Sequence, residues 1–168
     1  MTIAVGDMLP AGTLFRVTET GPTEVPTAAL FAGRTLAVVA VPGAFTPVCS
    51  EKHLPGFIAH ADEIKAAGID EIVCLSVNDV YVMRAWEEHS GASGKVAMYG
   101  DDGSFVKALG LALEIPRFGL GVRAKRFTML VRNGRVEQLN VEDSPSNVGV
   151  SSAEHMCSLK SQWKNPLA

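Results

Sequence analysis

Cysteine is scarce in this chain, and its thiols are not arranged in pairs. Cys49, Cys74 and Cys157 give an odd count of three in 168 residues, and no cysteine lies three positions before or after Cys49. An odd number of thiols does not suit a disulfide framework and is typical of a reducing compartment with reactive or buried thiols. The lack of a Cys-x-x-Cys pair also disfavours a thiol–disulfide oxidoreductase, which stays open as an alternative function.

The sequence also lacks the features that direct a chain to a membrane or to nucleic acid. No apolar run approaches the ~20 residues of a membrane span, and residues 1–7 lack the basic start and apolar core of a signal peptide. The net charge of −3 gives no electrostatic reason to bind nucleic acid or an anionic membrane. We therefore expect a cytoplasmic protein with no nucleic acid and no membrane as partner. Basic residues gather in one short cluster, Arg117, Arg123, Lys125 and Arg126. The cluster is too short to predict a nucleic-acid-binding groove and is more consistent with a local role.

Clusters of metal ligands are missing as well. His53 lies four residues after Cys49, on the same face of a helix, where it could act as a base or as one of two metal ligands. Two ligands are too few for a zinc site, and no second Cys/His cluster occurs. The sequence implies neither a metal nor an organic cofactor.

Apolar residues, by contrast, are plentiful. They make up 47% of the chain, without a composition shift, repeat or low-complexity tract, which suits one domain over residues 1–168 with a sizeable core. Strand and helix patterns alternate and are followed by a hairpin around Asn133-Gly134, which predicts an α/β domain with a mixed sheet. That order is the one that thioredoxin-like folds use. We expect strands at 36–41, 71–77, 95–99, 127–131 and 136–141.

Helices are expected between and after these strands. One runs from Cys49 to about residue 67, kinked by Pro55 and ended by Gly68. Others occupy residues 80–89, capped by Asn78-Asp79, residues 104–109 and, after a capping box of Ser151 with Glu154, a segment to about residue 163. A weaker pattern predicts an N-terminal hairpin at 14–25, with its turn at residues 21–22.

Cys49 has the most informative position of the three thiols. It follows the buried strand 36–41, with Thr46 suited to an N-cap and Pro47 to the first helical position. The free backbone N–H groups and the positive end of the helix dipole there favour the thiolate over the thiol. Open α/β sheets also place their ligands at the carboxyl ends of their strands, so we expect Cys49 to be a nucleophile.

The residues around Cys49 resemble those of a known family. Pro42, Thr46 and Cys49 match the Pro-x-x-x-Thr-x-x-Cys pattern of the peroxiredoxins, and the match extends over nearly the whole chain. The surrounding motifs are similar to the type II (peroxiredoxin V) branch. They are Lys-His-Leu-Pro-Gly-Phe at 52–57, Cys-Leu-Ser-Val-Asn-Asp at 74–79 and Lys-Arg-Phe at 125–127.

This resemblance implies a thiol peroxidase that reduces hydrogen peroxide and organic hydroperoxides in antioxidant defence. Cys49 would attack the peroxide and become a sulfenic acid. Thr46 would hydrogen-bond the thiolate and the peroxide, Arg126 would stabilise the developing charge, and Pro42 would shield the site from water. The backbone N–H groups of Val48 and Cys49 would complete the substrate site.

The family also implies partners. Glutathione with glutaredoxin, or thioredoxin, would supply the reducing electrons, and a homodimer would form through loops near the thiol. Phe45 and Trp86 are expected to be core residues or part of that dimer contact. Arg117 and Arg123 have no motif support and are interpreted as solvated charges or part of the approach to the site. Glu51, which many relatives replace with a different residue, is expected to have little effect on the thiol because positions two apart on a helix point in different directions.

The step that resolves the sulfenic acid has two candidate thiols. Cys74 matches a cysteine of plant and bacterial type II proteins, although its apolar strand also suits a packing residue. Cys157 partly resembles the resolving cysteine of the mammalian branch but follows a Ser-Ser-Ala-Glu sequence typical of the other branch. We slightly favour a one-cysteine cycle over an internal disulfide. A peroxide sensor or holdase without turnover is the remaining alternative.

Overall fold

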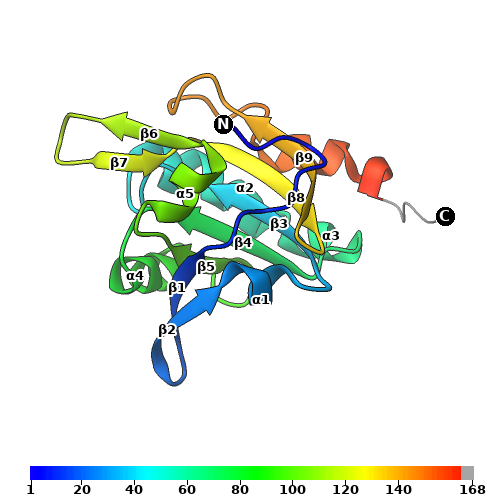
Figure 1. The fold of residues 1–168 in the computed structure, drawn as a ribbon, viewed down its shortest axis with the longest axis horizontal. Helices are drawn as coiled ribbons and strands as arrows, with labels where there is room; N and C mark the ends of the chain where they lie inside the picture. The colour runs from blue at the N-terminus through cyan, green and yellow to red at the C-terminus, as the bar shows by residue number, and fades with distance from the viewer. Residues whose placement is uncertain (164–168) are drawn as a thin grey trace.

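A mixed sheet of seven strands forms the centre of the protein, in a computed structural model that describes residues 1–163 (Figure 1). The strands lie in the order β2-β1-β5-β4-β3-β8-β9, with β3, β4 and β5 parallel and the remaining pairs antiparallel. This arrangement confirms the predicted α/β class and its thioredoxin-like order. The strand bounds are β1 Thr13–Thr18, β2 Gly21–Pro26, β3 Thr35–Ala40, β4 Glu71–Ser76, β5 Ala97–Gly100, β8 Phe127–Arg132 and β9 Arg135–Val141.

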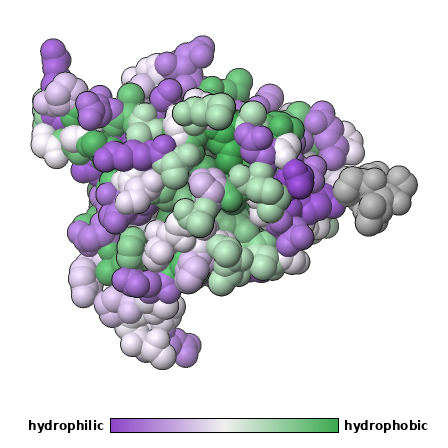
Figure 2. Space-filling view, viewed as in Figure 1, coloured by the Kyte–Doolittle hydropathy of each residue, from purple (hydrophilic) through white to green (hydrophobic). Residues whose placement is uncertain are grey.

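Helices cover both faces of the sheet. One core cluster joins the sheet to α2 (Leu54–Ala59), α3 (Ala61–Ala66), α4 (Val80–Ser90) and α6 (Ala153–Ser158). The other joins it to α1 (Thr27–Phe31) and α5 (Ser104–Leu109) and to the N-terminal segment. Figure 2 shows apolar residues over the middle of this second face and hydrophilic residues mainly at its rim.

Strand β3 shows why its sequence is a continuous apolar run rather than an alternating one. Ala37 and Val39 pack into the first cluster, whereas Leu36 and Val38 pack into the second. Side chains alternate across a strand, so a strand with helices on both faces must be apolar at every position. The same strand delivers the chain to Cys49 at its carboxyl end.

The predicted helix from Cys49 is divided into three pieces. Residues 47–48 begin it, Cys49–His53 form a π-helical turn in which the Leu54 N–H donates to the Cys49 carbonyl, and α2 and α3 follow with a break at His60. Pro55 lies at the start of α2, directly after the π turn. Because proline has no N–H to donate, the wider turn before it accommodates the interruption that Pro55 predicts. Gly68, with φ of +108°, ends the helical stretch as expected.

The hairpin turns are partly as predicted. Asn133 and Gly134 have φ of +47° and +79°, as a two-residue turn between β8 and β9 requires. The N-terminal hairpin also forms, but β2 begins at Gly21, so its turn lies at residues 19–20 instead of 21–22. Asp79 caps α4 as predicted, by accepting from Tyr81 N and Val82 N.

Three local features differ from the sequence-based expectation. The short helix α1 and a hairpin of β6 (Ala112–Ile115) and β7 (Gly121–Ala124) were not predicted, and the hairpin projects from the body of the molecule (Figure 1). Four-residue strands carry too little periodicity to be recognised. The cap of α6 is Ser152, whose Oγ accepts from His155 N, and not Ser151. In residues 1–163, no helix has the length and apolar content to span a membrane.

Candidate active site

Cys49 lies in the first helical turn that follows β3 and is buried, with 1% of its surface exposed. The Ser50 N–H donates to the Thr46 carbonyl at 2.9 Å, which places the helix start directly after Thr46, as predicted. The Thr46 hydroxyl does not cap this turn. It donates instead to the Gly43 carbonyl at 2.7 Å and so leaves the lone pairs of its oxygen free to accept.

Arg126 contacts the thiol directly. Its Nη2 donates to Cys49 Sγ at 3.0 Å, across 77 residues of sequence. The register of the sheet brings them together, because Phe127 of β8 pairs with Ala40 of β3 and Arg126 therefore lies beside the loop that leads to Cys49. Arg126 is itself buried, at 2% exposure. Cys49 therefore has a buried, permanently charged donor at hydrogen-bond distance.

His53 is the residue of this site whose contribution was not recognised from the sequence. Its Nδ1 accepts from Arg126 Nη1 at 2.8 Å, and its Nε2 donates to the Ser151 carbonyl at 2.7 Å. Burial, together with the charge of Arg126, lowers the pKa of His53 to about 4, against a smaller opposing effect of the Ser151 hydrogen bond. His53 is therefore neutral at physiological pH, and its one N–H points away from Arg126.

These contacts give His53 a third role, different from the two considered for it. Both ring nitrogens are engaged, one by the arginine and one by the backbone, so neither is free to bind a metal or to take a proton from Cys49. The pattern that predicts this position is its spacing of four from Cys49, which puts both side chains on one helical face. The spacing alone does not show that one arginine, Arg126, is hydrogen-bonded to both side chains.

The loop before Cys49 is held to the end of β4. Pro42 is buried, and the Ala44 N–H donates to Asn78 Oδ1 at 3.0 Å, the same oxygen that accepts from Ser76 Oγ at 2.6 Å. Phe45 has a φ of +62°, a left-handed conformation that is unusual for an aromatic residue. The loop therefore has a fixed path between β3 and the thiol.

Trp86 and Phe45 occupy different environments. Trp86 is buried, at 1% exposure, and its Nε1 donates to Ser50 Oγ at 3.1 Å, which confirms its interpretation as a core residue. Phe45 is 47% exposed, and its ring centroid lies 5.6 Å from that of His89 on α4. An exposed aromatic side chain thus lies in the loop that carries Pro42 and Thr46.

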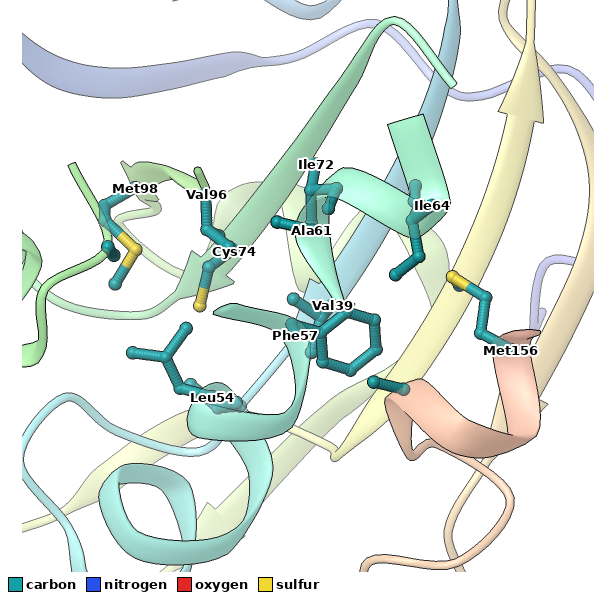
Figure 3. Close-up of a cluster of buried hydrophobic side chains, with 14 of the residues drawn as sticks. Val39, Leu54, Phe57, Ala61, Ile64, Ile72, Cys74, Val96, Met98 and Met156 are labelled. Carbon is teal, nitrogen blue, oxygen red and sulfur yellow. The ribbon is translucent and has the colours of Figure 1, made fainter. Parts of the chain in front are cut away.

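The other two thiols lie in the sheet and on α6. Cys74 is fully buried in β4, and its side chain points toward Leu54 of α2 (Figure 3). Burial raises the pKa of Cys74 far above that of a free thiol, and the neighbouring Cys49 raises it further. Cys157 is half-buried on α6, where burial and the adjacent Glu63 raise its pKa. All three cysteines are free.

The remaining charged candidates lie outside these contacts. Glu51 and Arg117 are exposed, in keeping with the small effect and the solvated charge expected for them. Arg123 is half-buried and donates to the carbonyls of Val77 at 2.8 Å and Leu120 at 2.7 Å, so it ties the β6–β7 hairpin to the end of β4. Of the basic cluster, only Arg126 is hydrogen-bonded to Cys49.

Comparisons with known proteins agree with this geometry. A model of the family described as Redoxin matches residues 4–156. Peroxiredoxin-2E-2, chloroplastic, of Oryza sativa subsp. japonica is 46% identical over 161 residues, which cover 92% of this chain and 71% of that protein. Peroxiredoxin-2B of Arabidopsis thaliana is 44% identical over 154 residues, which cover 90% of this chain and 94% of that protein.

A solved structure is similar over nearly the same length. The crystal structure of reduced Prx3 in complex with hydrogen peroxide from Vibrio vulnificus superposes with a TM-score of 0.90 at 46% identity, covering 95% of this chain and 99% of that one. The family model, the relatives and this structure agree with the resemblance found in the sequence. The chain belongs to the peroxiredoxins, the thiol-dependent peroxidases of the thioredoxin-like superfamily.

Proposed function

We propose that Cys49 is the residue that reduces the peroxide. Its thiolate attacks one oxygen of the O–O bond, an S–O bond forms, and the O–O bond breaks. The departing oxygen takes a proton and leaves as water or an alcohol, while Cys49 becomes a sulfenic acid and the peroxide is reduced by two electrons. The observation that carries this proposal is the 3.0 Å hydrogen bond from Arg126 to Cys49 Sγ, both of which are buried.

Arg126 has donors to spare for the substrate. A guanidinium carries five N–H groups, of which three are used by Cys49, His53 and the Pro145 carbonyl. The other two can donate to the peroxide oxygens as negative charge moves from sulfur to the leaving oxygen. A fixed cation beside that developing charge is a transition-state effect, because it costs no reorganisation when the bond breaks.

Thr46, Pro42 and the first helical amides complete the proposed site. Since the Thr46 proton is donated to the Gly43 carbonyl, the Thr46 oxygen is oriented to accept from the O–H of a hydroperoxide. Val48 and Cys49 precede Ser50, which makes the first backbone hydrogen bond of this helix, so their N–H groups are available for an oxygen of the substrate. Pro42, buried in the preceding loop, limits the access of water.

We propose hydrogen peroxide and organic hydroperoxides as substrates. The relative from Vibrio vulnificus was solved in complex with hydrogen peroxide, and it covers almost all of this chain at 46% identity. The residues proposed to bind the substrate would contact only the peroxide group, so they would not select for the organic part of a hydroperoxide. This selectivity for the O–O group suits a range of hydroperoxides.

For the return to the thiol, we propose a one-cysteine cycle in which glutathione with glutaredoxin, or thioredoxin, reduces Cys49 directly. Cys74 is fully buried in the centre of β4, and burial holds its thiol in the protonated form. A disulfide with Cys49 would need the π turn and α2 to unwind first. Cys157, half-buried and beside Glu63, is also protonated and is poorly suited to attack a sulfenic acid.

We further propose that residues 1–168 form one domain that works as a homodimer in the cytoplasm. The sheet and both core clusters draw on elements from the start of the chain to α6, which supports one folding unit. Phe45, Tyr81 and Phe118 expose 47%, 68% and 90% of their surface, and Phe45 lies near the thiol, where the dimer contact is expected. Light scattering of wild type and of Phe45→Ala at micromolar concentration tests this, and a wild-type monomer would contradict it.

The function is tested by measuring peroxide consumption in the presence of a recycling reductant. Wild type and the variants Cys49→Ser, Cys74→Ser and Cys157→Ser are each assayed with thioredoxin and with glutathione plus glutaredoxin. We expect only Cys49→Ser to abolish turnover. Loss in Cys74→Ser or Cys157→Ser would identify an internal resolving thiol, and full activity in Cys49→Ser would overturn the proposal.

Two further outcomes separate the alternatives. Consumption of about one peroxide per thiol, without turnover, would indicate a sensor or holdase rather than an enzyme. Intact mass after one equivalent of peroxide shows the resolving chemistry, because a sulfenic acid gains an oxygen whereas an internal disulfide loses two hydrogens.

A further inference from the structure

A single loop supplies two carbonyl groups that hold Arg126 in place, one directly and one through His53. This loop, residues 142–152, lies between β9 and α6. Its Pro145 carbonyl accepts from Arg126 Nε at 3.0 Å, and its Ser151 carbonyl accepts from His53 Nε2 at 2.7 Å. The position of the guanidinium beside Cys49 therefore depends on the path of a segment that belongs to no strand or helix.

Glu142 fixes the path of this loop at both ends. Its backbone N–H donates to the Arg126 carbonyl at 3.0 Å, which anchors the start of the loop beside β8. Its Oε2 accepts from Gly149 N at 2.7 Å, from Ser151 N at 2.8 Å and from Ser151 Oγ at 2.6 Å, which anchors the end. One carboxylate oxygen thus gathers three donors across nine residues of chain.

These contacts favour the charged form of Glu142. Partial burial raises the pKa of its carboxyl, but the hydrogen bonds from Ser151 and Gly149 outweigh this and lower the pKa overall. Hydrogen bonds to a carboxylate are shorter and stronger than those to a neutral oxygen, and a single neutral acceptor cannot replace three of them. The Ser151 carbonyl is therefore held by a charge that lies outside the contacts made by Cys49.

The Ser151 carbonyl in turn determines the state of His53. By accepting from Nε2, it fixes the proton of the neutral imidazole on that nitrogen and leaves the lone pair of Nδ1 for Arg126. Arg126 is thus held at Nε by Pro145 and at Nη1 by His53, and only Nη2 is directed at Cys49. A shift of the loop would release both restraints together.

We propose that Glu142 is a positioning residue for the peroxidase reaction, acting through the 142–152 loop and His53 to orient Arg126 toward Cys49 and the substrate. The proposal rests on the proposed function of Cys49 and Arg126. Glu142 does not touch the thiol or the peroxide. Its effect is on geometry, and displacement of a transition-state donor by a fraction of an ångström lowers the rate without removing any reacting group.

Glu142→Gln is the test, with Glu154→Gln as matched control. Glutamine keeps the shape of the side chain and loses the charge, while Glu154 lies just beyond the same loop, is exposed, and makes no hydrogen bond to the site residues. Mass spectrometry of the Cys49 peptide gives two rate constants for each variant, one with hydrogen peroxide and one with iodoacetamide. Alkylation needs only the thiolate, whereas peroxide reduction also needs the oriented guanidinium.

We expect Glu142→Gln to lower the peroxide rate constant about tenfold and the alkylation rate constant by a clearly smaller factor, with Glu154→Gln within about twofold of wild type for both. An equal loss in both rates would show a merely structural role, and a peroxide rate within about twofold of wild type would overturn the proposal. If Glu142→Gln does not fold, Ser151→Ala takes its place, because it removes one of the three donors to Glu142. The same two rate constants are measured, and a larger loss with peroxide than with iodoacetamide supports the proposal, whereas equal losses or an unchanged peroxide rate overturn it. Turnover in Cys49→Ser would instead refute the function of Cys49 itself.

Discussion

Cys49 and Cys74 are both buried thiols of the same core cluster, yet their surroundings prepare them for opposite behaviour. Cys74, in the middle of β4, faces apolar side chains, and burial raises its pKa and keeps it protonated. Cys49, at the end of a loop and the start of a helix, accepts a hydrogen bond from a buried guanidinium. Burial by itself favours the protonated thiol, which is inert, whereas the guanidinium beside Cys49 fits the nucleophile proposed for that position.

The same contrast applies to the backbone around the two thiols. Cys74 pairs with Val39 and Met98 in the regular ladders of β4 with β3 and β5, which resist local opening. Cys49 begins a π-helical turn followed by Pro55, where the hydrogen bonding of an α-helix is already interrupted. Cys49 thus lies in an irregular stretch of backbone, whereas Cys74 lies within a regular ladder.

Removing the cation should abolish most of the difference between the two thiols. We expect Arg126→Gln to lower the rate constant of Cys49 with hydrogen peroxide by about 100-fold or more, because the developing charge loses its strongest donor. Stopped-flow measurement of peroxide loss checks this. The matched control Arg123→Gln removes a half-buried arginine that is bonded to backbone carbonyls instead of the thiol, and should retain most of the activity. Equal losses in the two variants would contradict the assignment of Arg126.

Protonating His53 should destabilise the folded protein, an effect that originates at the Cys49 site and has no counterpart at Cys74. The pKa of His53 is about 4 in the folded protein, below the ordinary histidine value of 6.5, so the unfolded chain binds the extra proton first as pH falls. This contribution is complete above pH ~6.5 and is lost as the pH falls toward ~4, at a cost of about 3 kcal/mol in the free energy of unfolding.

Urea unfolding at pH 7 and pH 4.5, for wild type and His53→Gln, measures this effect. The variant lacks the titrating group and should lose less stability over the same interval. An identical loss in both proteins would show that other groups cause the acid sensitivity. His60 is half-exposed, and its Nδ1 donates to the Gly56 carbonyl at 2.9 Å, so it provides the control variant His60→Gln.

The Thr46 hydroxyl is a feature of the Cys49 site with no counterpart at Cys74. We expect Thr46→Val to lower the peroxide rate constant about tenfold, because the O–H of the substrate loses its acceptor, and Thr46→Ser to restore most of it. Alkylation by iodoacetamide should change less in Thr46→Val than peroxide reduction does. A fully active valine variant would show that Thr46 serves the loop through Gly43 and not the substrate.

The smallest effect is expected at Cys74 itself. Cys74→Ala should leave the rate of Cys49 oxidation within about twofold of wild type and lower the free energy of unfolding by about 1 kcal/mol, the effect of a small cavity in a packed core. Peroxide kinetics and urea unfolding of the same preparation measure both. A large loss of activity without a loss of stability would give Cys74 a role in the reaction and remove the contrast with Cys49.

Much of the fold could be predicted from local sequence. The run of β3 indicated a strand covered on both faces, Asn133-Gly134 indicated a hairpin, and Asp79 indicated the cap of α4, because each signal depends on neighbours within a few residues. The β6–β7 hairpin and α1 were missed, since four or five residues contain too few repeats of either period. The division of the helix at His60 was missed for a different reason, because no breaking residue stands there.

The sequence by itself determined which thiol stands at the end of a buried strand and the start of a helix, because strand, proline and helix start are consecutive in the chain. It did not determine what surrounds that thiol. The contacts of Arg126 with Cys49 and His53 join residues 77 and 73 positions apart, and those of His53 with Ser151 join residues 98 positions apart. These pairs depend on the register of β8 on β3 and on a loop fixed by Glu142, and only the packed tertiary structure sets both.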